Sequence, residues 1–264
     1  MSTKFQAYFI ECITNMHVGS GDANYGVVDK LVQRDPVTDY PTIHASSLKG
    51  ALREHFEKKW GKNDQKLDAI FGKEGKEGKD SETGEYKFLS ADLIAVPVRC
   101  NFENYILAIN KGLADDINAK AKLLTGKSVF NTINDNNTLY KNGHPNYEVF
   151  AEDIQLAKGN FTAPLNVADF ENLSEKYASV KTEDFRSITT ALPVIARNNL
   201  ENGVSKNLWY EQIVPHKTLF ITYIGVTDSH LTEFDSTLKK ELVQIGANAS
   251  IGYGLCKFHQ INFK

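Results

Sequence analysis

Two side chains that can move protons, His17 and Asp29, lie near each other in the N-terminal part of the sequence. Residues 5–10 alternate in the manner of a strand, and the alternation ends before the glycines Gly19 and Gly21. The pattern therefore predicts that His17 and Asp29 lie on loops at the end of a strand, where side chains can reach a ligand. An imidazole can shuttle a proton near neutral pH.

Both residues also have an ordinary structural explanation, which the residues alone favour. His17, beside Gly-Ser-Gly, can donate a hydrogen bond to a loop carbonyl, and Asp29, after two valines, can accept one from its own turn. The sequence holds no cluster of three or four carboxylates at short spacing. A preformed two-metal nuclease centre is therefore not expected, and no metal ligand is assigned.

A helix is predicted after this region, because apolar residues recur at helical spacing and Ser46 or Ser47 can cap its N-terminus. Lys49 and Arg53 are one turn apart on it, and Gly50 lets another backbone come close. Free N–H groups at a capped N-terminus and two cations suit a phosphate. The bland alternative is a solvated helix flank.

Two further segments in the C-terminal half carry candidate residues. An Asn-Gly pair within residues 196–206 predicts a long hairpin whose tip bears Arg197 and Lys206. Glu211 follows at the foot of that hairpin, either as a solvated carboxylate or as an auxiliary acid. The segment Gly252-Tyr253-Gly254 precedes the last predicted strand, either as an ordinary tight turn or as a close backbone approach to a ligand.

Composition limits the class of protein. The chain has 264 residues, 41% of them hydrophobic, so one large domain or two small ones is expected. It has no run of eighteen apolar residues and no hydrophobic signal core at its start, which argues against a membrane or secreted protein. Its three cysteines are far apart, as expected of reduced thiols in the cytoplasm. The net charge of −3 does not indicate a nucleic-acid-binding protein, so any such contact would have to come from local patches.

The coarse pattern is one of alternating strands and helices. Strands are predicted over 86–99, 105–109, 147–156, 188–195, 207–214, 217–226 and 255–263, and helices over 67–71, 111–124, 169–177 and 231–243. Two strand-helix-strand halves with long insertions favour an α+β, modified ferredoxin-like fold. Its first and last strands would be neighbours, which would bring His17 and Asp29 close to the glycine-rich loop 246–254.

Several segments, in this order, resemble one known family, the backbone subunits of the type III-B (Cmr) CRISPR effector within the RAMP superfamily. The segments are His17-Val-Gly-Ser-Gly21, Gly26-Val-Val-Asp29, Val32-Gln-Arg-Asp-Pro36, Ala45-Ser-Ser-Leu-Lys-Gly-Ala-Leu-Arg53, Phe88-Leu-Ser-Ala-Asp-Leu93, Val96-Pro-Val-Arg99, Leu208-Trp-Tyr-Glu-Gln-Ile-Val-Pro215 and Ile245-Gly-Ala-Asn-Ala-Ser-Ile-Gly-Tyr-Gly254. They touch both ends and the middle of the chain, so the resemblance covers nearly all of it.

The resemblance implies a single RAMP domain with an RRM-like palm, helical finger insertions and a β-hairpin thumb. The expected parts are a palm of about 1–45, 86–110, 145–190 and 215–264, fingers of about 46–85 and 111–144, and a thumb of about 191–214. It also implies RNA partners, namely a CRISPR guide and a complementary target RNA, together with copies of the chain and other Cmr subunits in a cytoplasmic antiviral ribonucleoprotein.

The resemblance also assigns roles to residues. Asp29 falls on the family's catalytic aspartate, which implies an endoribonuclease that cuts target RNA at regular intervals. We expect attack by the 2′-hydroxyl, leaving 2′,3′-cyclic phosphate and 5′-hydroxyl ends, with His17 and Glu211 as helpers. A divalent cation, Mg²⁺ or Mn²⁺, is implied without an identifiable ligand set.

Guide-RNA contacts are expected from a group of residues that could bind sugar and phosphate without reading sequence: Ser47, Lys49, Arg53, Arg197, Gly252, Tyr253 and Gly254. Three alternatives stay open beside the cleaving subunit. One is a non-catalytic structural guide-binding subunit, the second is the type III-A backbone homologue, and the third is a free-standing processing endonuclease of the same superfamily.

Overall fold

A large mixed sheet forms the frame of the protein, which a computed structural model describes for residues 3–21, 26–73, 81–167 and 176–263. The strands are β1 (Lys4–Cys12), β2 (Lys87–Phe88), β3 (Asp92–Val98), β4 (Ile106–Ile109), β5 (Thr138–Lys141), β6 (Val149–Ala151), β7 (Ile154–Gly159), β8 (Lys176–Ser179), β9 (Val194–Glu201), β10 (Val204–Gln212), β11 (Leu219–Val226), β12 (Leu242–Gln244) and β13 (Leu255–Gln260). The helices are α1 (Ala45–Trp60), α2 (Gln65–Phe71), α3 (Lys111–Thr125), α4 (Thr182–Thr190), α5 (Leu231–Lys240) and the 3-10 helix η2 (Ala249–Ile251).

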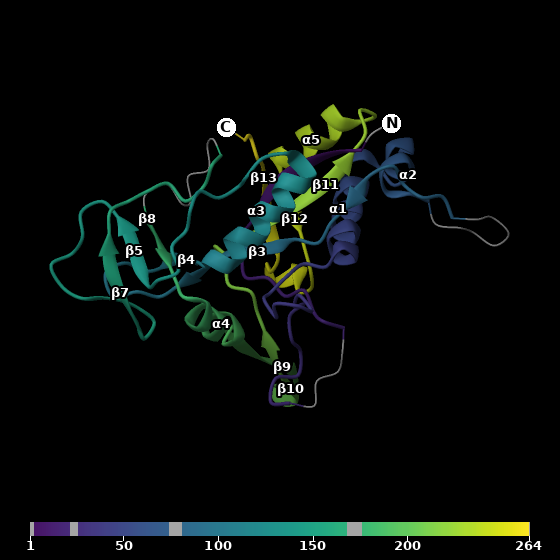
Figure 1. The fold of residues 1–264 in the computed structure, drawn as a ribbon. Coiled ribbons are helices and arrows are strands. Elements are labelled where there is room, and N and C mark those ends of the chain that lie inside the picture. Colours follow the sequence, from purple (N-terminus) through teal and green to yellow (C-terminus); the bar gives the residue numbers. More distant parts are fainter. Residues whose placement is uncertain (1–2, 22–25, 74–80, 168–175, 264) are drawn as a thin grey trace.

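The sheet has the order β12-β13-β1-β11-β3-β4-β8-β5-β7-β6, and β2 pairs with β11 beside this path (Figure 1). Its centre is antiparallel, with β1 between β13 and β11, and β11 next to β3. Because α1 follows β1 and α5 follows β11, these four strands have the connectivity of a ferredoxin-like fold. The predicted fold class is confirmed, and so is the pairing of the first and last strands, in which Cys12 lies opposite Cys256.

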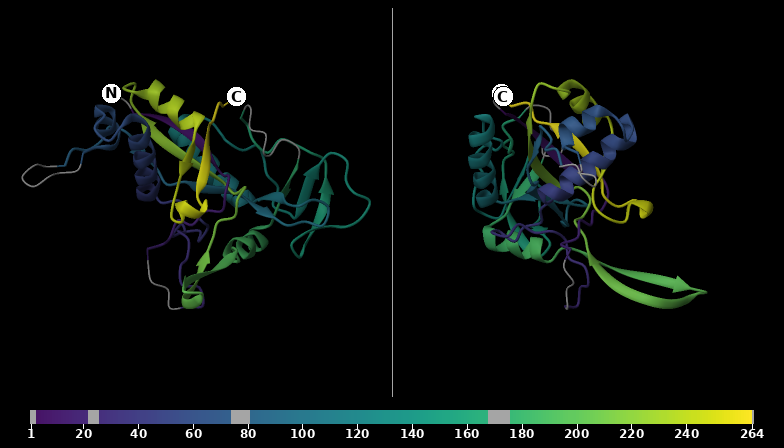
Figure 2. Two further views of the ribbon diagram at one scale, coloured as in Figure 1. Left: turned by 180° about the vertical axis from the view of Figure 1, so that it is seen from behind. Right: turned by 90° about the vertical axis from the view of Figure 1, so that its right-hand side faces the viewer.

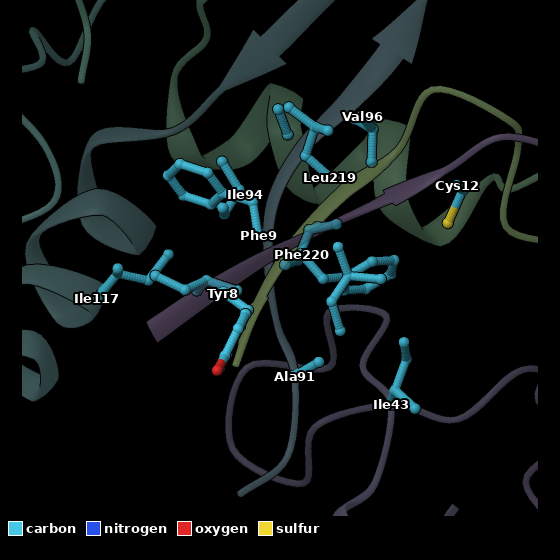
Figure 3. Packing of buried hydrophobic residues seen from close by; sticks show 14 of the residues in the cluster. Tyr8, Phe9, Cys12, Ile43, Ala91, Ile94, Val96, Ile117, Leu219 and Phe220 are labelled. Atoms are coloured by element: carbon cyan, nitrogen blue, oxygen red, sulfur yellow. The ribbon is translucent and has the colours of Figure 1, made fainter. Parts of the chain in front are cut away.

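Helices cover both faces of the central strands. On one face α1 and α5 pack together through Phe56 and Phe234, whose ring centroids are 4.7 Å apart, while α3 lies on the opposite face (Figure 2, right-hand view). Tyr8 and Ile10 on one face of β1 and Phe9 on the other are therefore all buried. Figure 3 shows Tyr8 and Phe9 within the core. None of the helices in the described parts of the chain is long and apolar enough to span a membrane.

The first predicted helix is confirmed as α1, but its start differs from the prediction. Ala45 is the first helical residue and His44 precedes it without a side-chain cap, so neither Ser46 nor Ser47 is the N-cap. Ser47 cannot cap because it lies inside the first turn, where its hydroxyl oxygen accepts a hydrogen bond of 2.8 Å from Gln33.

Two predicted elements in the middle of the chain are wrong in part. The strand expected over 147–156 is a hairpin of β6 and β7, because Glu152 takes a left-handed φ of 52° and turns the chain. The helix expected over 169–177 ends in residues that form β8, whereas residues 168–175 lie outside the described residues. Sequence periodicity did not detect the turn, since left-handed backbone at a glutamate is uncommon.

α4 occupies part of a segment that the sequence assigned to a strand over 188–195. Its β-branched residues favour a strand, but the helix is stabilised by acidic residues in the first turn, among them Glu183. It also buries Phe185, whose ring meets that of Tyr40 edge to face at 5.3 Å. Packing against a loop far away in the sequence therefore overrides the local propensity.

The helix predicted over 111–124 is confirmed as α3, capped by the Asn110 side chain, which accepts a hydrogen bond of 3.1 Å from the Leu113 N–H. It packs against β1 and β3. The helix expected over 231–243 is shorter than predicted, because α5 ends at Lys240 and β12 follows.

β9 and β10 form a two-stranded sheet, the thumb hairpin, which projects from the body (Figure 2, right-hand view). Asn202 and Gly203 have φ values of 52° and 81° and lie between the paired residues Glu201 and Val204, as in a two-residue hairpin turn. The Asn-Gly signal is confirmed. Arg197, however, lies opposite Trp209 near the foot of the hairpin and not at its tip.

Candidate active site and RNA interface

Asp29 lies on a loop that is fastened along β10. The backbone N–H of Lys30 donates to Tyr210 O (3.1 Å), and the N–H of Gln212 donates to Lys30 O (2.9 Å). The Asp29 carboxylate itself accepts a hydrogen bond of 2.7 Å from the Tyr210 N–H. The side chain of Asp29 is exposed, so a fixed carboxylate faces solvent beside the thumb hairpin.

His17 is bound to the same strand two residues further on. Its Nδ1 lies 2.7 Å from Gln212 O, and because a carbonyl only accepts, Nδ1 carries the proton and donates. His17 is 3% exposed. A β-carbon added at Gly19 would lie 3.3 Å from its Nε2, so the loop backbone packs closely against the ring. The structure therefore confirms the ordinary explanation of His17, a donor to a carbonyl, and leaves its Nε2 as the group for any proton transfer.

Glu211 is 2% exposed and accepts hydrogen bonds from four side chains. Oε1 accepts from Lys30 Nζ (3.0 Å) and Trp209 Nε1 (2.8 Å), and Oε2 accepts from Arg197 Nε (3.3 Å) and Asn248 Nδ2 (2.8 Å). We call these five residues the Glu211 cluster. Burial acts to raise the pKa of Glu211, but the hydrogen bonds from Trp209, Lys30 and Asn248 outweigh it and lower the pKa to about 2. The solvated carboxylate envisaged from the sequence is wrong.

The glycine-rich loop packs directly on the His17 segment. The Ala247 N–H donates to His17 O (2.9 Å), and the Gly254 N–H donates to Asn15 O (2.8 Å). A β-carbon added at Gly246 would lie 2.3 Å from His17 O. Only glycine fits at this position, because the two backbones are in direct contact there. The expected proximity of His17 to this loop is thereby confirmed, and Lys30, next to Asp29, is linked to the loop through Glu211 and Asn248.

Arg197 joins the hairpin to that loop. Its guanidinium lies 4.5 Å from the ring centroid of Tyr253, and its Nε donates to Glu211. Its Nη2 is buried and has no hydrogen-bond partner in the described part of the chain. Tyr253 itself is half-buried beneath this cation, next to Gly252, whose φ of 81° favours glycine.

The two cations of α1 differ in what they contact. Arg53 donates to Glu57 Oε1 (3.0 Å) and to Gly72 O (2.6 Å) and lies 3.7 Å from Asp68, so it ties α1 to α2. Lys49, half-buried, makes no hydrogen bond or ion pair to any residue that the structure describes. The predicted phosphate contact therefore suits Lys49 better than Arg53.

Comparisons with known proteins place these features in a family. Residues 9–257 match the model of the RAMP superfamily. The chain belongs to the RAMP superfamily. It is 27% identical over 281 aligned residues to the CRISPR system Cmr endoribonuclease Cmr4 of Pyrococcus furiosus, covering 93% of this chain and 92% of that one.

Two solved structures share the fold of this RAMP protein. A chain of the type III-B Cmr-beta complex bound to cognate target RNA superposes with a TM-score of 0.78 at 20% identity, covering 97% of this chain and 96% of that one. Oligomeric Cmr4 from Pyrococcus furiosus gives a TM-score of 0.72 at 19% identity, covering 98% and 99%. The resemblance to type III-B backbone subunits that the motifs indicated is confirmed.

The described residues of this RAMP chain do not provide a closed metal site. They contain no group of three or more His, Cys, Asp or Glu side chains that could hold an ion. Asp29 offers a single carboxylate, and both oxygens of the neighbouring Glu211 already accept from two cations, an indole N–H and an amide N–H. The donor set therefore does not fit a metal held by protein ligands alone.

One positioning residue was missed by sequence reasoning. The buried amide of Gln33 donates from Nε2 to Ser47 Oγ (2.8 Å) and to Gly19 O (3.2 Å), and its Oε1 accepts from the His44 N–H (2.8 Å). It thus joins the His17 loop to the N-terminus of α1. A signal existed, because Gln33 belongs to one of the motifs that carried the family resemblance, but nothing local gave it a role.

Proposed function

We propose that this RAMP protein is the guide-RNA-binding, filament-forming backbone subunit of a type III-B CRISPR effector, and that it cleaves complementary target RNA at regular intervals in cytoplasmic antiviral defence. The observation that carries the proposal is the exposed Asp29 carboxylate held on the Tyr210 N–H. Its support is the match along nearly the whole chain to a protein named a Cmr endoribonuclease.

The geometry suits a cleavage in which the RNA supplies its own nucleophile. Asp29 orients the 2′-hydroxyl at the cut site and accepts its proton while the 2′-oxygen bonds to the adjacent phosphorus. The bond from phosphorus to the 5′-oxygen breaks, and that oxygen takes a proton from water. The products are a 2′,3′-cyclic phosphate and a 5′-hydroxyl. A divalent cation, Mg²⁺ or Mn²⁺, is expected to arrive with the RNA and to screen phosphate charge.

Guide binding is assigned to groups that still have capacity for a ligand. Lys49 is unpaired among the described residues, and Arg197 Nη2 is a buried donor without a partner beside Tyr253. Ser47 and the backbone of Gly252 and Gly254 complete the set. Contacts of this kind bind sugar and phosphate without reading the bases, as a subunit that serves any guide requires.

The thumb hairpin is assigned to a neighbouring copy and its RNA. Leu208 and Tyr210 lie on one face of β10 and are 53% and 39% exposed, and Val204, on the other face beyond the register shift at residue 206, is 61% exposed. A two-stranded hairpin that leaves apolar side chains in water is marginally stable by itself, so a partner surface is expected to cover them. The proposed partners are the guide–target duplex on the next subunit, together with other Cmr subunits.

The test is cleavage by the reconstituted ribonucleoprotein. We expect wild type to cut a matched target at even spacing, and Asp29→Ala to cut ~10²–10⁴-fold more slowly with unchanged guide and target binding, because a proton acceptor acts in the transition state. Asp135→Ala, an exposed loop aspartate, is the matched control. A target with a 2′-deoxy residue at the cut site should resist wild type.

Two results would contradict this proposal in different ways. Cleavage of the deoxy-substituted linkage would exclude attack by the 2′-hydroxyl and require an activated water. Tight guide binding without any cleavage by wild type would instead favour the alternative of a purely structural subunit. Sequencing of co-purified RNA tests whether the chain carries a guide at all.

A further inference from the structure

The Glu211 cluster joins three parts of the protein that are far apart in the sequence. Lys30 belongs to the loop that carries Asp29, Arg197 and Trp209 belong to the two strands of the thumb hairpin, and Asn248 precedes the 3-10 helix of the glycine-rich loop. All four donate to one buried carboxylate. Truncating this one acceptor would therefore remove a side-chain contact from all three segments at once.

We propose that Glu211 is a positioning residue that couples the thumb hairpin to Asp29, so that seating of the hairpin on RNA sets the geometry of cleavage. This inference rests on the proposed function. The sequence left open that Glu211 is an auxiliary acid in cleavage. The inference instead gives Glu211 a structural role, as a carboxylate that stays ionised and keeps its hydrogen-bond partners.

The coupling follows from how the Asp29 loop meets β10. Lys30 bridges to Glu211 in parallel register through backbone hydrogen bonds, and its ammonium binds the Glu211 carboxylate. One residue earlier on both segments, the Asp29 carboxylate accepts from the Tyr210 N–H. The loop and the strand thus move as one piece, and a shift of the hairpin foot shifts the Asp29 oxygens with it.

The foot of the hairpin is held by backbone hydrogen bonds to Lys30, by the bond from His17 to Gln212 O, and by the Glu211 cluster. β9 and β10 form a two-stranded sheet apart from the main sheet, and many of the hairpin side chains are exposed. Arg197 stacks on Tyr253 while donating to Glu211, so the angle between hairpin and glycine-rich loop is set at this carboxylate. A displacement of the projecting tip, as on RNA binding, would therefore shift the residues of the Glu211 cluster.

The ionisation and the hydrogen bonds of Glu211 distinguish a positioning role from acid–base catalysis. With a pKa of about 2, the Glu211 carboxyl is ionised at neutral pH and has no proton to donate. As an acceptor it is occupied, since two cations, an indole N–H and an amide N–H already share its two oxygens. A buried carboxylate with such partners fixes geometry, whereas the exposed Asp29 can meet RNA.

The experiment compares Glu211→Gln and Lys30→Met with wild type in the assembled guide complex, by single-turnover cleavage at saturating target over a range of pH. We expect each variant to lower the maximal rate ~100-fold, the effect of a small misplacement of a reacting group, with target affinity changed less than ~3-fold. The shape of the pH–rate profile, with both its acidic and its basic limb, should be the same in each variant as in wild type. The double variant should be no slower than the worse single variant, because both remove one contact.

A milder variant keeps the test informative if those proteins fold poorly. Trp209→Phe keeps a ring and removes only the indole donor, so a loss of ~10-fold is expected with the same pH profile. Hydrogen exchange should rise at residues 26–31 and in β10 in all three variants. Glu241→Gln, which breaks a surface ion pair with Lys59, is the matched control and should behave as wild type.

The outcomes distinguish this inference from the proposed function. If Glu211→Gln removed one limb of the pH–rate profile while Lys30→Met stayed at the wild-type rate, Glu211 would be an acid–base group and the coupling would be wrong. Rates and exchange within ~2-fold of wild type in all variants would also reject it. Failure of wild type to cleave would reject the proposed function alone, and hydrogen exchange would still report whether the cluster fixes the Asp29 loop.

Discussion

Different interactions hold the palm and the foot of the thumb hairpin. Around β1 the side chains are apolar and fully buried between helices on both faces. At the hairpin foot one carboxylate, two cations and two polar N–H donors hold strands that are otherwise exposed. The palm thus gains its stability from burial, whereas the foot gains its geometry from charge and hydrogen bonds.

The difference shows how the two regions can serve one activity. Packed cores resist deformation, so the palm can carry a guide without changing shape. A charged cluster between exposed strands fixes direction with little buried apolar area, and it can yield when a ligand competes for its donors. Under the proposed function, this separation would let the hairpin respond to RNA while the palm stays folded.

The strongest test of this difference between palm and hairpin is to make the same substitution in both regions. Leu219→Ala on β11 removes a fully buried side chain and is expected to lower the free energy of unfolding by ~2–5 kcal/mol. Leu208→Ala on β10, where the leucine is 53% exposed, should cost at most ~0.5 kcal/mol. Urea denaturation of the purified chain measures both. Equal losses would mean that the hairpin is part of the packed core.

The second test asks whether charge on the palm serves the fold or a ligand. Lys49→Ala should weaken guide binding equally for unrelated guide sequences, and lower the slope of log affinity against log salt by ~0.7, as loss of one phosphate contact predicts. Arg53→Ala should mainly loosen the contact between α1 and α2, because Arg53 already binds Glu57 and Gly72. Filter binding at several salt concentrations measures the slope.

The outcome that contradicts this assignment is specific. A loss at Lys49 that depended on guide sequence would indicate base recognition instead. A larger change of slope for Arg53→Ala than for Lys49→Ala would show that Arg53 leaves its intramolecular partners when RNA binds.

What could be predicted from the sequence was local. The strand at residues 5–10 and the turn at Asn202-Gly203 were found because periodicity and turn chemistry are written in adjacent residues. Residues 188–190 were misassigned to a strand because their helix depends on Phe185 meeting Tyr40, far away in the chain. Local pattern cannot report such a contact.

The candidate site divides in the same way. Asp29, His17 and Glu211 were singled out by residue type and family resemblance, but their partners were not. Asp29 binds a backbone amide 181 residues away, and Glu211 binds Asn248 across 37 residues. Only the fold brings these atoms together, so the sequence could name the groups and not the geometry that separates an exposed carboxylate from a buried one.

The smallest expected effect is a loosening of the hairpin foot in acid. The folded pKa of Glu211, about 2, lies below its ordinary value of 4.5, so its ionised form stabilises the folded state above pH 4.5. This contribution is lost progressively as the pH falls from about 4.5 to about 2. We expect the fluorescence of Trp209, in a Trp60→Phe background, to change over that window as its indole hydrogen bond to Glu211 weakens.

The matched control is the same measurement on Glu211→Gln, which has no carboxyl to titrate and should show no change attributable to this residue. The palm, whose central contacts are apolar, should keep its far-ultraviolet circular dichroism while Trp209 responds. If the palm signal and the Trp209 signal changed together at one pH, the foot would not be a separate charge-dependent unit, because a single cooperative transition would then govern both regions.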